Sequence, residues 1–85
     1  MKKLWHDKAW NAYAKWQQQD KRTLKRINDL LKSIERNGYN CIGKPEPLKG
    51  ALAGKWSVRV DEENRIVFRI AEGILEIFSC ADHYE

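Results

Sequence analysis

The chain has 85 residues, of which 16 are Lys or Arg and 12 are Asp or Glu, so its formal net charge is +4. Its two cysteines, Cys41 and Cys80, have no C-x-x-C spacing and no histidine cluster beside them, which argues against a zinc site and a disulfide framework. Its apolar runs last only a few residues, and its first residues have no secretory apolar stretch. We therefore expect one cytoplasmic domain over residues 1–85, with reduced thiols and no membrane span.

The charges are divided unevenly along the chain. Residues 1–50 contain twelve Lys or Arg against five Asp or Glu, whereas residues 51–85 contain four against seven. This asymmetry favours a polyanionic partner for the first half. A surface that is charged only for solubility explains the same counts equally well.

The N-terminal half predicts a short strand followed by a helical hairpin. Residues 2–6 are expected to form the strand, and Asp7 is expected to cap a helix that ends near Gln18. Asp20 is expected to cap a second helix, which ends at Asn37-Gly38. The apolar stripe of this second helix is Leu24, Ile27, Leu31 and Ile34, and its opposite face is basic: Arg22, Lys25, Arg26, Lys32 and Arg36. That face is either ordinary helix solvation or a phosphate-contacting stripe.

The segment 39–55 has neither a helical nor a strand period, and it contains three glycines and two prolines. Glu46 lies between Pro45 and Pro47, whose fixed φ angles hold the backbone extended. Lys44 and Lys49 flank this carboxylate. A carboxylate on a stiff basic loop suits catalysis, although most loop glutamates only face solvent.

The last third of the chain predicts three antiparallel strands, at 56–60, 65–70 and 74–80. The apolar residues of the first two strands share one face only if Val60 lies opposite Asn64 and Arg59 opposite Arg65. The fold class that results is α+β. A small antiparallel sheet, made of the N-terminal strand and this meander, packs against the helical hairpin.

A two-residue turn at Glu72-Gly73 extends the same alternation to the third strand. It pairs Arg69 with Glu76 and Arg65 with Cys80. The face away from the helices would then display Ser57, Arg59, Arg65 and Arg69. Because like charges on neighbouring strands repel each other, we expect this face to bind an anion.

If the proline-bracketed loop folds over that face, Glu46, Arg59, Arg65, His83 and Tyr84 converge. Cleavage of RNA without a metal needs a base for the 2′-hydroxyl, an acid for the leaving 5′-oxygen and cations for the charge on phosphorus. Glu46 suits the base and His83 the acid, with Arg65 the first choice of cation and Arg59 the second. Tyr84 either stacks on a base or plugs the sheet edge. His83 taken alone would more often be a surface histidine, and His6 gives no reason for a functional role.

Several motifs together resemble a known family. "GKPEPLKG", "GKWSVRVDEENRIVFRI", the terminal "DHY" and "LWHDKAWNAYAKWQQQDKRTLKRINDLLK" are similar to the YoeB/Txe group of the RelE toxin superfamily across nearly the whole chain. Members of that group are the toxins of bacterial type II toxin–antitoxin pairs. The resemblance implies a metal-independent mRNA interferase without a cofactor, which cleaves mRNA in the ribosomal A site and leaves a 2′,3′-cyclic phosphate and a 5′-hydroxyl.

The resemblance also implies roles for individual residues and partners. Glu46 would be the general base, Arg65 the transition-state stabiliser, His83 the general acid and Tyr84 an essential positioning residue. RNA and phosphate contacts would fall to Lys44, Lys49, Arg59 and Arg69. The implied partners are a YefM/Phd-type antitoxin, the ribosome with its mRNA, and a second copy of the chain.

Three positions depart from the pattern of the relatives. Glu85 follows the tyrosine at which many of them end, Val58 replaces a frequent arginine, and Asn64 replaces a frequent histidine. None of these changes removes an assigned catalytic group. Two other functions are compatible with the sequence: a ParE-like toxin that binds gyrase without catalysis, and a basic RNA-binding module.

Overall fold

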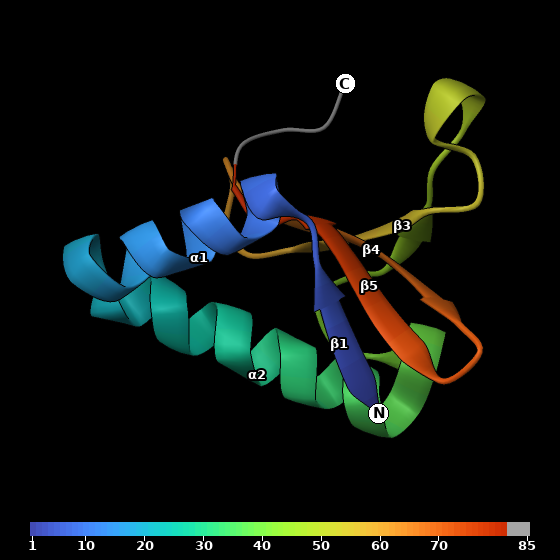
Figure 1. Ribbon diagram of the computed structural model, residues 1–85, viewed down its shortest axis with the longest axis horizontal. Coiled ribbons are helices and arrows are strands. Elements are labelled where there is room, and N and C mark those ends of the chain that lie inside the picture. The colour runs from blue at the N-terminus through green and yellow to red at the C-terminus, as the bar shows by residue number, and fades with distance from the viewer. Residues whose placement is uncertain (82–85) are drawn as a thin grey trace.

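Two antiparallel helices form one layer of the protein (Figure 1). In the computed structural model, which describes residues 1–81, strand β1 (Lys2–Trp5) leads into helix α1 (Asp7–Gln19), and α2 (Lys21–Asn37) follows directly. The predicted strand and helices are confirmed to within one or two residues. Neither helix is long and apolar enough to cross a bilayer.

The start of α2 is held by Asp20, as predicted. Its carboxylate accepts hydrogen bonds from the Arg22 and Thr23 amides, both at 3.1 Å, and from the Thr23 hydroxyl at 2.8 Å. These bonds, the Thr23 hydroxyl foremost, lower the pKa of Asp20. The predicted cap of α1 is wrong: His6 occupies the N-cap position without a side-chain bond, and Asp7 lies in the first turn.

The second layer is a five-stranded sheet with the order β1-β5-β4-β3-β2. Strands β2 (Glu46–Pro47), β3 (Trp56–Arg59), β4 (Arg65–Ala71) and β5 (Ile74–Ser79) pair antiparallel, whereas β1 runs parallel to β5. The α+β class is therefore confirmed, with a sheet that is mixed rather than wholly antiparallel. The parallel pair is possible because the helical hairpin and the meander connect β1 to β5.

The register deduced from the alternation is confirmed over most of the meander. Arg59 lies opposite Arg65, and the Val60 amide donates to the Asn64 carbonyl at 3.0 Å. Arg69 lies opposite Glu76, and the turn between β4 and β5 falls at Glu72-Gly73. The side-chain alternation therefore determined which residues meet across these strands.

The predicted pairing of Arg65 with Cys80 is wrong because β5 contains a bulge. Phe68 lies opposite Ile77, but Val67 lies opposite Ser79, so that Phe78 is an extra residue in its strand. Cys80 is consequently turned into the core, where it is fully buried and its thiol donates to the Ala9 carbonyl at 3.3 Å. Burial raises the pKa of this thiol to about 11.

The apolar faces of both layers meet in one core. Ile27, Leu30 and Ile34 of α2 are fully buried, as are Phe68 of β4 and Ile77 of β5. The predicted stripe of α2 thus faces the sheet, except that Leu24 is only half-buried. The opposite face of the sheet, which faces away from the helices and carries the charged residues, is called the open face below.

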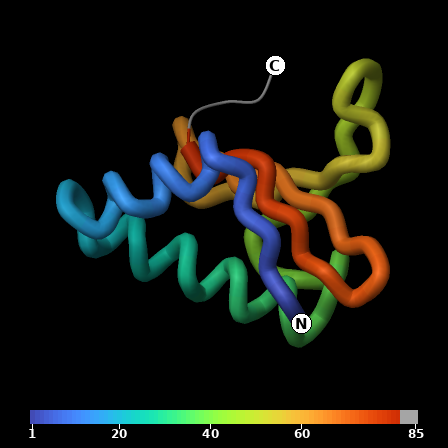
Figure 2. Tube along the Cα trace, viewed as in Figure 1, coloured from blue at the N-terminus to red at the C-terminus, as the bar shows by residue number. Residues whose placement is uncertain are grey.

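Gly43 allows the chain to pass close to this core just before Glu46. Its φ is +94°, and its carbonyl accepts a hydrogen bond from the Arg59 amide at 2.8 Å. A Cβ at this position would lie 2.6 Å from Leu30 Cδ2 and 3.1 Å from Val58 Cβ. Beyond β2 the chain leaves the sheet in a loop containing the turns of η2 (Gly50–Leu52), shown in yellow in Figure 2.

Substitution of Gly43 tests this close approach, and Gly50 provides a matched control. Both glycines have a positive φ, but a Cβ at Gly50 meets no atom within 4 Å. Gly50→Ala should cost about 1–2 kcal/mol of unfolding free energy from backbone strain alone, whereas Gly43→Ala should cost about 2–5 kcal/mol because overpacking is added. Urea unfolding measures both, and equal losses would contradict the close packing of Gly43 against Leu30 and Val58.

Candidate active site on the open face of the sheet

Glu46 is held against the sheet by a short edge strand. In β2, Glu46 lies opposite Ser57 and Pro47 opposite Trp56. A proline is tolerated there because an edge strand does not need every backbone N–H. Lys44 has a left-handed φ of 53°, which is costly for a residue with a side chain and turns the chain into this pairing. The segment was expected to fold over the sheet, and it instead extends the sheet by one strand.

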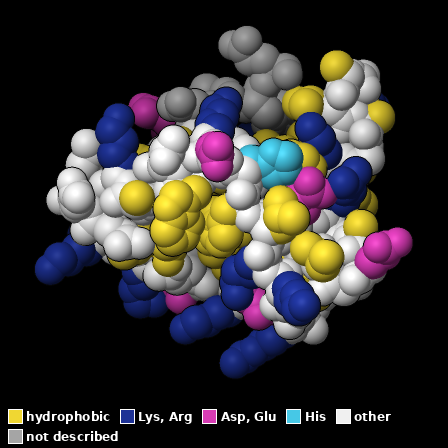
Figure 3. Space-filling model, in the orientation of Figure 1, with side chains coloured by type: hydrophobic (Ala, Val, Ile, Leu, Met, Phe, Trp, Pro, Cys, Tyr) yellow, Lys and Arg dark blue, Asp and Glu magenta, His cyan; other side chains and the backbone are white. Residues whose placement is uncertain are grey.

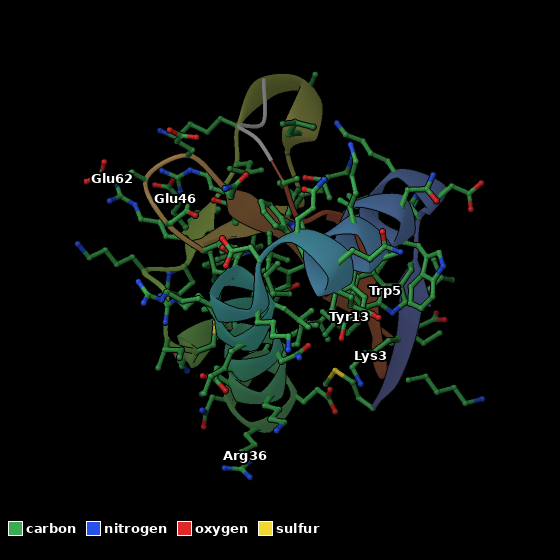
Figure 4. The ribbon with its side chains drawn as sticks, turned by 90° about the vertical axis from the view of Figure 1, so that its left-hand side faces the viewer. Lys3, Trp5, Tyr13, Arg36, Glu46 and Glu62 are labelled. Atoms are coloured by element: carbon green, nitrogen blue, oxygen red, sulfur yellow. The ribbon has the colours of Figure 1, made fainter. Side chains whose placement is uncertain are left out.

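This pairing places the Glu46 carboxylate beside Arg65. The Oε1 of Glu46 lies 3.4 Å from Nη1 of Arg65, and the same nitrogen lies 3.5 Å from Oγ of Ser57. The Arg65 side chain is 18% exposed, while that of Glu46 is 50% exposed. Arg65 is therefore largely enclosed by its neighbours, and the carboxylate faces the solvent at the edge of the sheet (Figure 4).

Ser57 was predicted to be displayed on the open face, and this prediction is wrong. Its side chain is fully buried between Glu46 on β2 and Val67 on β4, which are its register partners. Arg65 Nη1 is within hydrogen-bonding reach of its hydroxyl, so this buried oxygen helps to fix the guanidinium. Ser57 thus positions Arg65 from below rather than facing a ligand.

Arg59 and Arg65 lie side by side on neighbouring strands, as the sequence predicted. Arg59 is exposed, and its backbone carbonyl is held by the Arg26 guanidinium of α2 at 3.1 Å. Like charges at opposed strand positions destabilise a sheet unless a counter-ion lies between them. The pair is therefore suited to bind a phosphate.

The turn that joins β3 to β4 leads directly into Arg65. The sequence did not predict the hydrogen bonds that close this turn. Oδ1 of Asp61 accepts hydrogen bonds from the Glu63 amide at 2.8 Å and the Asn64 amide at 2.7 Å. Partial burial acts to raise the pKa of Asp61, but these bonds and the one from the Asn64 side chain outweigh it, so the pKa is lowered. The D-x-x-N spacing was a usable signal, because Asp commonly closes such turns.

The other predicted site residues fall into three groups. Lys44 and Lys49 are exposed on either side of Glu46. Arg69 does not join the site, since it pairs with Glu76 at the far end of β4. His83 and Tyr84 lie outside the described residues 1–81.

The described part of the site combines one carboxylate with several cations on a solvent-facing edge. Such an arrangement binds a phosphodiester through its guanidinium groups and presents a proton acceptor beside it. Within residues 1–81, no three His, Cys, Asp or Glu side chains lie close enough together to hold a metal ion.

Comparison with known proteins gives one consistent family. A family model described as "YoeB-like toxin of bacterial type II toxin-antitoxin system" matches residues 5–84. A Synechocystis protein named Toxin YoeB is 48% identical, over 100% of this chain and 99% of its own. The Escherichia coli K12 protein of that name is 44% identical, over 99% of this chain and 100% of its own.

Solved structures give the same result. A "YoeB/ParE toxin" from Agrobacterium tumefaciens superposes with a TM-score of 0.95 at 42% identity, over 99% of this chain and 100% of that one. A Staphylococcus aureus "YoeB-YefM complex" has a TM-score of 0.92 at 41% identity, and a "YoeB dimer" from the same species 0.91 at 42%, each over 99% of this chain and 98% of the other.

The repulsion between the two arginines predicts an unusual effect of removing one of them. Arg59→Thr should raise the urea midpoint relative to Arg69→Thr, because Arg59 faces an arginine and Arg69 faces a glutamate, while the gain in strand propensity is common to both. The difference should shrink in 1 M NaCl, where charges are screened over about 3 Å. Equal midpoints at low salt would contradict an electrostatic conflict between Arg59 and Arg65.

Proposed function

Since this chain belongs to the YoeB-like toxins of bacterial type II toxin–antitoxin systems, we propose that it is a ribosome-dependent endoribonuclease. Its substrate would be mRNA in the ribosomal A site, and its effect would be to stop translation. The reaction would need no metal, because side chains supply the base, the acid and the cation. The ribosome would hold the message in the geometry that the reaction requires.

In the proposed reaction, Glu46 removes the proton of the 2′-hydroxyl. The 2′-oxygen then attacks the adjacent phosphorus, and the bond from phosphorus to the 5′-oxygen breaks. His83 gives a proton to the departing 5′-oxygen, and the products carry a 2′,3′-cyclic phosphate and a 5′-hydroxyl. Each acid–base step is typically worth roughly 10²- to 10⁴-fold in rate.

Arg65 is proposed to stabilise the charge that grows on the phosphate oxygens. Its guanidinium is enclosed by Ser57 and Glu46, so that little reorganisation is needed when the charge develops. Arg59, Lys44 and Lys49 are proposed to bind flanking phosphates. Tyr84 is proposed to position the RNA, as the resemblance to the family implies.

One observation carries this proposal. A carboxylate and a guanidinium from separate strands lie 3.4 Å apart, beside a second arginine that the register forces alongside the first. Glu46 offsets part of the repulsion between the two arginines, and a bound anion would offset more of it. A phosphate bound between them would explain why both arginines lie there. The adjacent carboxylate would be the base for its cleavage.

We also propose that a YefM-type antitoxin binds this chain. The staphylococcal structure at 41% identity is described as a complex of YoeB with YefM. The charge of +4 on this chain favours an acidic segment of the antitoxin. Such a segment would compete with RNA for the arginines of the open face.

A homodimer is proposed as well, because a relative 42% identical is described as a dimer. Trp5 and Tyr13 line a groove of about 380 Å³ beside Trp10, which is 49% exposed. Figure 3 shows hydrophobic side chains gathered there, between β1 and the helices, and Figure 4 shows Trp5 and Tyr13 on the opposite side from Glu46.

We propose that the second copy docks on the surface around the exposed Trp10. Trp10→Glu should give the monomer mass by light scattering, because it places a charge in a buried apolar contact. Ile42→Glu, a matched change at another exposed apolar residue, should leave the dimer intact. A dimer that survives Trp10→Glu would exclude this surface.

The nuclease mechanism is tested by inducing the chain in cells and mapping mRNA ends by primer extension. The wild-type chain should cut translated messages, whereas Glu46→Gln and His83→Ala should each lower cleavage roughly 10²- to 10⁴-fold and restore growth. Glu62→Gln removes an exposed acid from the neighbouring hairpin turn and should stay toxic. Circular dichroism checks that each variant is folded.

The same experiment separates the alternatives. Full cleavage by both Glu46→Gln and His83→Ala would contradict the proposed mechanism. DNA damage without cut messages would indicate a gyrase-binding toxin instead. Tight, salt-sensitive RNA binding with intact messages would indicate a binding module without catalysis.

A further inference from the structure

A second group of functional side chains lies on the same open face, around the ring of Phe78. The Lys55 ammonium lies 4.2 Å from the centroid of this ring and the Arg69 guanidinium carbon 5.8 Å from it. The His6 ring is tilted against Phe78 with centroids 4.5 Å apart. His6 directly follows β1, Lys55 directly precedes β3, Arg69 lies in the second half of β4, and Phe78 is the extra residue of β5. We call them the Phe78 cluster.

The bulge in β5 produces this arrangement. Without the extra residue, the alternation would be continuous, and Cys80 would lie on the open face. With the bulge, Phe78 stays on the open face beside Ser79, and Cys80 turns into the core. A large aromatic side chain on a solvent-facing side of a sheet, surrounded by basic groups, is not needed for core packing.

The Phe78 cluster and the candidate active site lie on one row of paired residues that runs across the strands. Glu46 is opposite Ser57, Ser57 is opposite Val67, and Val67 is opposite Ser79, next to Phe78. Three strand spacings separate β2 from β5, which corresponds to about 14 Å. A single RNA strand that crosses the sheet from Glu46 therefore passes over Phe78 a few nucleotides away.

The balance of charge around Phe78 favours an anion. Glu76 is the acidic neighbour, and it already binds two of the basic groups: its Oε2 is 2.8 Å from His6 Nε2, and its Oε1 contacts Arg69. Among residues 1–81, no carboxylate forms an ion pair with Lys55. Figure 3 shows a histidine (cyan) beside acidic and basic side chains on this surface. Lys55 is thus available to neutralise a phosphate.

We propose that the Phe78 cluster is a second RNA subsite, in which a nucleobase stacks on Phe78 and Lys55 binds a neighbouring phosphate. The inference rests on the proposed nuclease function and extends the substrate contact beyond the scissile bond. Aromatic rings flanked by cations are the usual platform for single-stranded RNA. An acidic antitoxin segment is the other candidate occupant. Its carboxylates would bind the cations of the cluster, but they would not stack on the aromatic ring.

The backbone and side chain of Lys55 suit this role. Its carbonyl accepts from the Leu48 amide at 2.9 Å, and its amide donates to the Leu52 carbonyl at 3.1 Å, so the base of the loop is fixed. The side chain is long and flexible. Its ammonium can leave the ring for a phosphate, which frees that part of the ring for a base.

The test measures cleavage of purified ribosome–mRNA complexes at several complex concentrations. Phe78→Leu keeps the apolar bulk and loses stacking, and it should raise KM roughly 5- to 150-fold with little change in kcat. Lys55→Gln should raise KM as well, and its urea midpoint must be compared with that of the wild type because the change also removes the cation over the Phe78 ring. Ile42→Ala, an exposed apolar residue elsewhere, should match the wild type.

A second experiment measures the Kd of a labelled single-stranded RNA oligonucleotide for the cleavage-deficient Glu46→Gln chain. Adding Lys55→Gln should lower the slope of log Kd against log salt concentration by about 0.7, the value for one lost phosphate contact. Adding Lys21→Gln, an exposed residue of α2 outside its predicted basic face, should leave the slope unchanged. Urea midpoints of all variants separate a binding defect from a loss of fold.

Each outcome supports or overturns the subsite. Wild-type KM and salt slope in folded Phe78→Leu and Lys55→Gln chains would overturn it. Weaker binding of an acidic antitoxin peptide by these variants, with unchanged RNA kinetics, would also overturn it and assign the cluster to the antitoxin. The failure of the nuclease proposal itself would look different, because Glu46→Gln would then keep the wild-type kcat.

Discussion

The register of β2, β3 and β4 is the constraint on which the rest of the structure depends. It places Glu46 over Ser57 and Arg59 against Arg65, and it thereby concentrates one carboxylate and two guanidinium groups within two strand spacings. A shift of one residue would send every one of these side chains to the core face. The apolar residues of the same strands prevent such a shift, because Val58, Ile66 and Phe68 must stay buried.

The remaining elements hold this register in place from both sides. On the core side, Arg26 of α2 binds the carbonyls of Arg59 and Val60, and Gly43 lets the chain before β2 bond to the Arg59 amide. On the open side, Asp61 closes the turn that leads into Arg65. The described part of the candidate site therefore lies on paired strands of the sheet, which suits the proposed reaction because it depends on fixed charges.

The sequence predicted those features that side-chain periodicity controls. The apolar stripe of α2 predicted the helix that covers the core. The alternation of Trp56, Val58 and Val60 predicted the pairing of Arg59 with Arg65. It did not predict the bulge at Phe78, because an extra residue leaves no mark on a strand that is apolar on both faces. It also missed β2, since a strand of two residues with a proline has no measurable period, and it missed the burial of Ser57, which follows from that strand. The Phe78 cluster depends on both the bulge and the position of Lys55, so it became visible only in three dimensions.

The central claim is that Glu46 and Arg65 act as one unit on a single phosphate. A double-mutant cycle with Glu46→Gln and Arg65→Gln, measured as cleavage of ribosome-bound mRNA, tests it most directly. If the two groups act together, the double variant should lose about as much activity as the more damaged single variant. If the losses multiply, the two side chains act independently, and the claim is wrong.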